Sequence, residues 1–379
     1  FSGEYSWQYF GVPVKEVGAA PTFIGSFLRK YNEAKNDVTY QRDGGTTGSY
    51  YNKWDKLAGT SVLNAFAGYS ITQDAPTTYT IKGQLNLCDA SITLTRNATV
   101  VPGSSDANNK RYGLGQNLFG NSFTAAIPVS KLNFPDKVEK TVYLYNTGSF
   151  GSWAGASLSA DATAAGSYLS IPYNAADAMD VQIPSMQGFL LRHLGYEDDN
   201  PDKSITMTLP YSELTKNTKP QRTARQALSY LSIELQSKST VDKLWLFHQD
   251  GTTAGFDNGW DGYKFFGTPT AFIYALTPDG NMQVSATPDL NGSNINFVAS
   301  SDRDYSLKII KVNTDKNYAK LYLYDRFSEK AVALNNDTTY YNFSATEQSA
   351  SSRFRIVSDE NNIEDTFQNL SAYSNKEVI

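Results

Sequence analysis

The stretch YSWQYFGVPV (Tyr5 to Val14) and the stretch GQNLFGNSFTAAI (Gly115 to Ile127) decide the fold of this chain. Each is a short apolar run that breaks at a Phe-Gly pair, Phe10-Gly11 or Phe119-Gly120, and then resumes with Val-Pro or Asn-Ser. A glycine inside a strand permits a kink or a close approach of another backbone. The same strand and kink therefore occur twice, which indicates a repeated structural unit.

A common order of features follows both kinks. The distance between corresponding features grows from 109 residues at the kink glycines (120 − 11) to 124 at the last strand (205 − 81), as loop insertions would cause, and only Trp153 departs from this drift. The ordered features predict an internal duplication, with repeats at about 1–100 and 111–210. They are FLRKYNEA (27–34), Trp54, AFAGYSIT (65–72) and TTYTIKGQL (77–85) in the first copy, and TVYLYNTGS (141–149), Trp153, PSMQGFLLR (184–192) and KSITMTLP (203–210) in the second.

Composition favours strands throughout the chain. The 379 residues are too many for one ordinary core, so two or three domains are expected. The 25 Tyr and 20 Phe, together with abundant Thr, Ser, Asn and Gly, are typical of strands and tight turns. We therefore predict an all-β fold of tandem β-sandwich modules, in which aromatic side chains such as Trp7 and Tyr145 fill the interior.

Beyond the duplicated region, 1–210, the pattern predicts two further modules. Alternating apolar residues and a PDGN hairpin turn (278–281) indicate a second β-sandwich at 211–288. About seven short strands in roughly 70 residues predict an immunoglobulin-like sandwich at 289–358, without its disulfide. Residues 359–379 are expected to be a linker and the stub of a missing C-terminal domain, because YSNKEVI begins what looks like a strand and then stops.

Several classes of function lack their signatures. The net charge is −5 with scattered Lys and Arg, so nucleic-acid binding is not expected, and no apolar run is long enough for a membrane span. There is no phosphate-binding loop and no Gly-x-Ser-x-Gly elbow, and neither His193 nor His248 has a neighbouring nucleophile. The acidic loop EDDNPD (197–202) does not place two carboxylates across a sugar-sized cleft. A non-catalytic protein is predicted, and the single Cys88 is expected to be a small buried residue in a strand.

One Gly-rich turn carries a candidate metal site. Asp257 and Asp261 flank the residues Asn-Gly-Trp, and carboxylates this close are suited to a hard cation such as Ca²⁺. The alternative is a structural turn, in which the Asp side chains accept hydrogen bonds from backbone N–H groups. Lys264 is a further candidate partner for Asp261. No cofactor is expected apart from this possible structural Ca²⁺.

Two tryptophans are candidates for stacking on sugar rings. Trp260 lies in the same turn as the two aspartates, and Trp153 lies in the Gly-, Ser- and Ala-rich stretch 148–168. A Trp on a glycine-rich loop is less constrained by core packing than one inside a strand. The alternative is that these rings, like the other aromatics, simply fill the edges of the sandwiches.

The ordered motifs resemble the β-rich region that precedes the C-terminal secretion tail in large adhesin-like secreted surface proteins of the Bacteroidetes. This resemblance implies an exported, non-catalytic structural protein, extracellular or on the outer cell surface, and it does not specify a ligand. A glycan or a surface protein is the candidate partner. The alternatives are a carbohydrate-binding accessory protein and a secreted glycan hydrolase. The motifs are Trp7 to Pro13, Tyr31-Asn32-Glu33, Trp54, Ala67 to Ile71, Gly115 to Phe123, Ile183 to Phe189, Phe256 to Gly267 and Leu321 to Val357.

Overall fold

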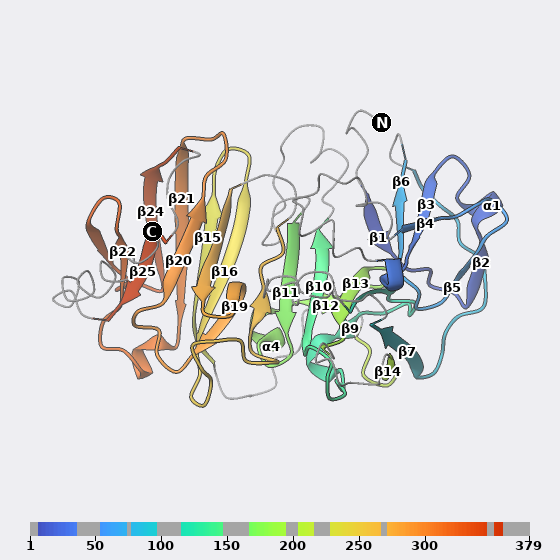
Figure 1. The fold of residues 1–379 in the computed structure, drawn as a ribbon, viewed down its shortest axis with the longest axis horizontal. Helices are drawn as coiled ribbons and strands as arrows, with labels where there is room; N and C mark the ends of the chain where they lie inside the picture. The colour runs from blue at the N-terminus through green and yellow to red at the C-terminus, as the bar shows by residue number, and fades with distance from the viewer. Residues whose placement is uncertain are drawn as a thin grey trace, which may run out of the picture. The chain divides into compact units, whose positions relative to one another are not determined.

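The regular secondary structure of the described residues is almost all β-strand, as predicted (Figure 1). A computed structural model divides it into two compact units, with described residues between 7 and 215 in the first and between 228 and 358 in the second. No helix among these residues is long and apolar enough to cross a membrane. The residues described are 7–35, 54–73, 77–96, 115–146, 167–194, 204–215, 228–266, 271–346 and 352–358.

The first unit contains two four-stranded sheets with the same strand order. In each half the first strand pairs with the fourth, the fourth with the second and the second with the third. The two halves are therefore copies of one sheet-building unit. The first sheet has the order β1 (Gln8–Phe10), β6 (Tyr69–Thr72), β3 (Phe27–Tyr31), β4 (Trp54–Lys56), and the second the order β8 (Gln116–Gly120), β13 (Gly188–Arg192), β10 (Thr141–Asn146), β11 (Ser167–Pro172).

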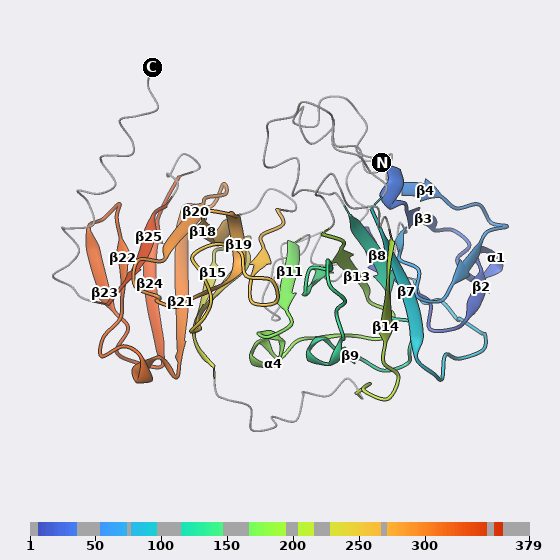
Figure 2. The same cartoon turned by 60° about the horizontal axis from the view of Figure 1, so that its bottom comes forward.

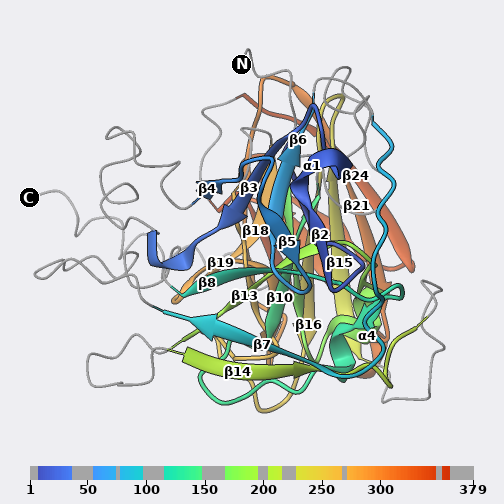
Figure 3. The same ribbon diagram turned by 90° about the vertical axis from the view of Figure 1, so that its right-hand side faces the viewer.

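Smaller elements repeat in the same way. Each half has a two-stranded ribbon, and a final strand from each half joins an antiparallel pair in which Ile92 lies opposite Met207 (Figure 3). The second copy thus completes a sheet that the first begins. The ribbons are β2 (Glu16–Gly18) with β5 (Val62–Asn64) and β9 (Ile127–Pro128) with β12 (Gln182–Ile183); the joining strands are β7 (Ala90–Thr95) and β14 (Ser204–Leu209); the short helices are α1 (Ala19–Thr22), η1 (Glu33–Lys35), η3 (Val129–Lys131) and α4 (Ala176–Met179).

The two copies meet at the kink glycines. A Cβ atom built on Gly11 would lie 2.6 Å from the Cα of Gly120, and one built on Gly120 would lie 2.3 Å from the Cα of Gly11. The surrounding hydrogen bonds are reciprocal, because Gly11 N donates to Met186 O (2.8 Å) and Gly120 N donates to Phe66 O (3.3 Å). Corresponding groups of the two copies therefore contact each other across an approximate twofold axis.

The aromatic side chains occupy two depths in this unit. Tyr69 and Tyr143 are fully buried in the cores of the two copies. Trp7 is half-buried beneath the guanidinium of Arg29, 4.3 Å from the ring centroid, and the half-buried Tyr145 stacks on Tyr9 at 4.8 Å. Trp7 and Tyr145 thus pack against neighbours at the margin of the core, and the expected interior position is corrected to this extent.

The described strands of the second unit form one sheet of eleven strands, and its outer strands β22, β23 and β25 are labelled in Figure 2. All of its pairs are antiparallel except β16 with β19, and the predicted PDGN hairpin joins β18 to β19. The sheet order is β23 (Lys330–Ala333), β22 (Tyr322–Asp325), β25 (Phe354–Val357), β20 (Asn294–Val298), β18 (Phe272–Thr277), β19 (Gly280–Thr287), β16 (Val241–His248), β15 (Ser229–Gln236), β21 (Asp304–Val312) and β24 (Thr338–Ser344), with β17 (Gly262–Tyr263) also on β19 and η4 (Thr314–Lys316) between β21 and β22.

Strands from both sides of residue 288 alternate in this sheet. The strand β15 pairs with β21, and β18 pairs with β20, so segments 211–288 and 289–358 share backbone hydrogen bonds. The sheet also folds onto itself, because Phe297 of β20 contacts Tyr305 of β21 (ring centroids 4.9 Å apart) and Phe354 of β25 contacts Phe343 of β24 (5.2 Å). The boundary expected at residue 288 is therefore not a domain boundary, since one core serves both segments.

Two further predictions concern Cys88 and the C-terminal residues 359–379. Cys88 is exposed in a bend just before β7, next to the exposed Leu87, so the prediction of a buried strand position is wrong. The alternating stretch 77–85, expected to be the last strand of the first copy, also forms no strand, and β7 (Ala90–Thr95) is the strand that pairs with β14. Residues 359–379, expected to be a linker and the stub of a further domain, lie outside the described residues.

Candidate functional site

The candidate site of the second unit is the turn that leads from β16 to β17. The carboxylate of Asp257 accepts hydrogen bonds from the backbone N–H of Thr253 (2.6 Å) and from its hydroxyl (3.1 Å). The backbone carbonyl of Asp257 accepts from the N–H groups of Trp260 (2.9 Å) and Asp261 (3.0 Å). Both polar groups of Asp257 thus close the turn on itself, which is how Asp side chains stabilise tight turns.

Asp261 attaches this turn to the sheet. Its side chain is fully buried, with one oxygen accepting from Asp257 N (2.6 Å) and the other from Ala286 N of β19 (2.7 Å). Burial raises the pKa of the Asp261 carboxyl to about 7, although these two N–H donors lower it. Asp279 adds a third anchor by accepting from Phe256 N at 2.8 Å. The turn is therefore held by carboxylates that serve as hydrogen-bond acceptors.

This geometry corresponds to the structural-turn alternative. Backbone N–H groups already occupy carboxylate oxygens of both aspartates, and a cation would have to compete with them. Across the described ranges, no group of three or more His, Cys, Asp or Glu side chains is placed to hold a metal ion. A structural Ca²⁺ at Asp257 and Asp261 stays a prediction. Lys264 does not pair with Asp261 but with Asp242, which faces it from β16.

The two candidate tryptophans differ in what the structure describes. Trp260 is half-buried in the turn, where its backbone is fixed by Asp257, and the stacked rings of Phe256 and Tyr263 (4.7 Å apart) lie in the same segment. Trp153 lies outside the described residues. The proposal of sugar stacking stays a prediction for both residues.

Three buried ion pairs among the described residues were not foreseen from the sequence. Arg353 donates to Asp325 through two nitrogens (3.0 and 2.9 Å), and Tyr341 donates to the same carboxylate (2.8 Å). Burial alone would raise the pKa of the Asp325 carboxyl, but these hydrogen bonds outweigh it and hold the pKa below its ordinary value. The other pairs are Arg192 with Glu139, which Tyr143 also contacts, and Lys264 with Asp242.

The carboxyl of the buried Glu139 has a raised pKa, in contrast to that of Asp325. Burial raises the pKa of its carboxyl, and the guanidinium of Arg192 and the hydroxyl of Tyr143 offset only part of this effect. A shifted carboxyl in a cleft would be a candidate catalytic acid. Glu139 is fully enclosed by protein, however, so its environment indicates a structural role.

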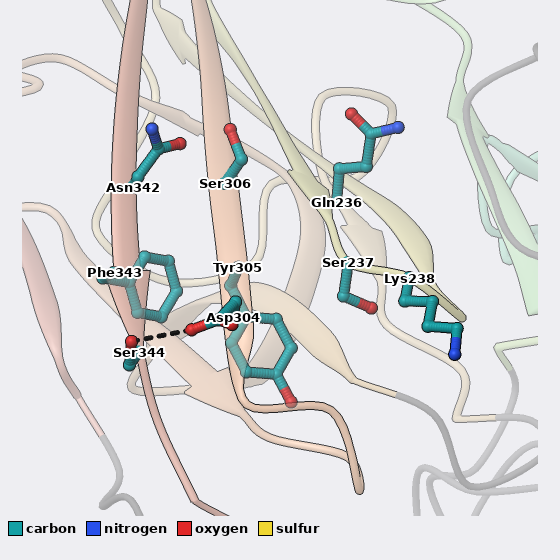
Figure 4. A pocket seen from close by; sticks show the side chains of 9 residues that line it. All are labelled: Gln236, Ser237, Lys238, Asp304, Tyr305, Ser306, Asn342, Phe343 and Ser344. Atoms are coloured by element: carbon teal, nitrogen blue, oxygen red, sulfur yellow. Dashed lines mark hydrogen bonds between the residues drawn. The ribbon is translucent and has the colours of Figure 1, made fainter.

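A shallow hollow of about 510 Å³ lies over the ends of β15, β21 and β24 (Figure 4). Gln236, Ser306 and Asn342 are cross-strand neighbours that form a row of polar side chains on it. The hydroxyl of Ser344 donates to Asp304 at 2.9 Å. Asp304 is the one carboxylate that lines the hollow, and glycoside hydrolysis requires two across a cleft. The hollow therefore lacks that catalytic arrangement.

The histidines do not supply a nucleophilic site either. His248 contacts the Tyr318 hydroxyl through Nδ1 (2.8 Å) and the Asn317 amide through Nε2 (2.7 Å), so its ring nitrogens have partners other than Ser or Cys. His193 is fully buried. The hydrogen bonds of His248 thus connect neighbouring segments of the fold and do not form a nucleophilic site.

The comparison with known proteins agrees with this picture. The chain is 34% identical to the Minor fimbrium subunit Mfa5 of Porphyromonas gingivalis, a member of the Bacteroidetes, in an alignment 395 positions long that covers 95% of the chain. It spans 29% of that relative's length. No protein-family model and no solved structure matches the chain. The predicted resemblance to surface proteins of the Bacteroidetes is confirmed at the level of similarity to a fimbrial subunit, and the position before a C-terminal secretion tail stays a prediction.

Proposed function

We propose that the chain is a non-catalytic, adhesin-like structural segment of a fimbrial subunit on the outer surface of a Bacteroidetes-type bacterium. The similarity to a minor fimbrium subunit along 95% of the chain carries this proposal. The structure supports it because its ionisable networks are buried within sheets and serve stability. Rigid β-modules of this kind extend a surface structure and present loops at their ends.

The proposed partner is a glycan or another surface protein. The half-buried Trp260 and the polar hollow over β15, β21 and β24 are the described features through which such a contact would be made.

Immunogold electron microscopy tests the location directly. Antibodies raised against the purified chain would be applied to intact cells of the source bacterium and to a strain with the gene deleted. We expect label along surface filaments of the parent strain, label in the sheared filament fraction, and none on the deletion strain. Label confined to the cell interior, or label on the surface that never enters the filament fraction, would contradict the proposal.

A further inference from the structure

Two arginines share one face of the sheet of the second unit. Arg355 belongs to β25, the strand between β20 and β22 (Figure 2), and its pairing partners there are Asn294 and Tyr324. Arg326 directly follows β22, two residues after Tyr324, so its side chain leaves the same face. The Nη2 atom of Arg326 donates to the Oδ1 atom of Asn294 at 2.8 Å. Both guanidiniums therefore lie close to Asn294.

The guanidinium of Arg326 is positioned by neutral acceptors. Besides the contact with Asn294, its Nη1 atom donates to the backbone carbonyl oxygen of Ser352 (3.1 Å) and to the hydroxyl oxygen of the same residue (2.7 Å). These acceptors fix the direction of the guanidinium, but they carry no negative charge that would neutralise it. Arg326 is half-buried, and burial and the neighbouring Arg355 lower the pKa of its side chain.

The guanidinium of Arg355 has a donor without an acceptor. Its Nε atom is buried and has no hydrogen-bond partner among the described residues. The group lies against the backbone of Gly292, where a Cβ atom would lie 3.1 Å from the Nη2 atom. Burial lowers the pKa of this side chain as well. An unsatisfied buried donor and a cation without a counter-charge both cost free energy, and an anion bound here would remove both costs.

Arg353, two residues before Arg355, shows the contrasting arrangement. Its guanidinium is neutralised by the buried carboxylate of Asp325. In the part of the chain that the structure describes, no carboxylate lies within ion-pair distance of Arg326 or Arg355. A guanidinium binds a carboxylate through two parallel N–H···O hydrogen bonds. The two unpaired arginines are therefore suited to take up an anionic group from outside the chain.

We propose that Arg326 and Arg355 bind the carboxylate of an acidic sugar. The carboxylate accepts from the two guanidiniums, and its negative charge offsets the repulsion between them. The Ser352 hydroxyl and the Asn294 amide, which position Arg326, are also groups that form hydrogen bonds with sugar hydroxyls. A pair of cations bordered by neutral polar groups matches a sugar acid, whereas an acidic protein surface requires an extended basic patch.

This inference deepens the proposed function, because it names a class of glycan, and it rests on that function for the choice of a sugar as the carrier of the carboxylate. The binding assay uses the purified chain, whereas the location of the protein is tested on cells. Failure of the assay would therefore leave the proposed surface location intact.

Titration calorimetry of the purified full chain with two matched pairs of probes tests the site. The pairs are an oligogalacturonate with its methyl ester, and sialyllactose with lactose, and in each pair the second sugar lacks the carboxylate. We expect at least one acid to bind at least about tenfold more tightly than its neutral partner, and added salt to weaken this binding. Equal binding within both pairs, or no binding of either acid, would overturn the proposal. An oligo-aspartate peptide that binds as tightly as the acids would reject the sugar as the carrier.

Two variants assign the binding to this arginine pair. Arg355→Gln should lose at least about tenfold in affinity for the acid, while its stability should be unchanged or higher, because a cation without a counter-charge is removed. Arg303→Gln is the matched control, since it removes the same charge from an exposed arginine of the same unit and should bind like the wild type. If Arg355→Gln does not fold, the two pairs of probes on the wild type decide. Wild-type affinity in folded Arg355→Gln, or a loss of stability equal to that of Arg353→Met, would overturn the proposal.

Discussion

The two units of the chain achieve close packing in different ways. In the first unit, two copies of a sheet approach each other where side chains are missing, and the backbones of Gly11 and Gly120 are in contact. In the second unit, one sheet folds onto itself, and buried carboxylates hold together segments that are far apart in sequence, such as Asp325 with Arg353. Buried ion pairs occur in both units, since Arg192 with Glu139 lies in the first. The difference is that the two copies of a repeated unit also meet through backbone contact where side chains are missing.

Breaking the buried ion pair of Arg353 and Asp325 is expected to lower the free energy of unfolding more than any other change. Arg353→Met leaves the Asp325 carboxylate buried with only Tyr341 as side-chain donor, which should lower the free energy of unfolding by about 3–5 kcal/mol. Urea unfolding measures the loss, and hydrogen exchange should place it in the strands between 229 and 357. The control Lys311→Met breaks an ion pair whose carboxylate, Asp315, is 75% exposed, and should cost less than about 1 kcal/mol.

The pH dependence of stability is a second test of the ion pair of Asp325 and Arg353. Because the pKa of the Asp325 carboxyl is lowered in the folded state, its contribution to stability is present above the ordinary carboxyl pKa and is lost as the pH falls through the lowered value. In Arg353→Met this contribution should be largely absent. If the difference in stability between wild type and variant stays constant from neutral pH to pH values below that pKa, the anchoring role of the ion pair is wrong.

Filling the contact between the two copies is expected to have the next largest effect. Gly11→Ala and Gly120→Ala each place a Cβ atom within 2.6 Å of backbone, so each should lower the free energy of unfolding by about 3 kcal/mol. The approximate twofold axis predicts that the two losses are similar. Gly59→Ala is the control in the same unit, since its nearest contact would be 3.6 Å away, and it should be nearly neutral. Strongly unequal losses at Gly11 and Gly120 would contradict a symmetric contact.

The Asp turn should show a smaller effect that depends on pH. Asp261→Asn has one acceptor oxygen for two backbone N–H groups, so the variant should lose about 1–2 kcal/mol. The pKa of Asp261 is raised from 3.8 to about 7, so wild-type stability should decline as the pH rises between these values, because the unfolded chain releases its proton first.

Unfolding measured across this pH range separates the two aspartates. The decline should be absent in Asp261→Asn and present in Asp257→Asn, which changes the same turn but leaves the buried carboxyl in place. A decline of equal size in Asp261→Asn would assign the pH dependence to another group.

Sugar binding by the turn is tested on a glycan array. If Trp260 stacks on a sugar ring, Trp260→Ala should lose most of the binding, because stacking on one aromatic ring contributes a large part of a weak sugar contact. The variant Phe327→Ala is the control, since that exposed ring lies elsewhere in the unit. Equal binding by wild type and Trp260→Ala would remove this candidate.

Addition of Ca²⁺ is expected to have the smallest effect on stability. Since backbone N–H groups already engage the carboxylates of Asp257 and Asp261, we expect the melting temperature to stay the same with and without millimolar Ca²⁺. An upward shift that is lost in Asp257→Asn would instead establish the metal site and make this turn a ligand-dependent anchor.

Parts of the candidate site were predictable from local chemistry. The Asp-rich turn was expected because Asp side chains near Gly accept from their own backbone, and Asp257 does so. The partner of Lys264 was not predictable, since Asp242 lies 22 residues away and faces Lys264 only after β16, β17 and β19 have paired. The strand expected at 77–85 was wrong because alternation of residue types does not distinguish a strand from an extended surface segment, and β7 begins only at Ala90.

The sequence by itself determined that this chain forms strands and that its first half is written twice, because period-two alternation and the Phe-Gly kinks are local properties. Its ordered motifs also indicated a resemblance to surface proteins of the Bacteroidetes, and the similarity to a fimbrial subunit of that group agrees with it. Only the tertiary structure decided that β15 pairs with β21 and β18 with β20, and that the two kinks contact each other. Pairing between distant strands depends on which edges remain open after the nearer strands have paired, and no single segment contains that information.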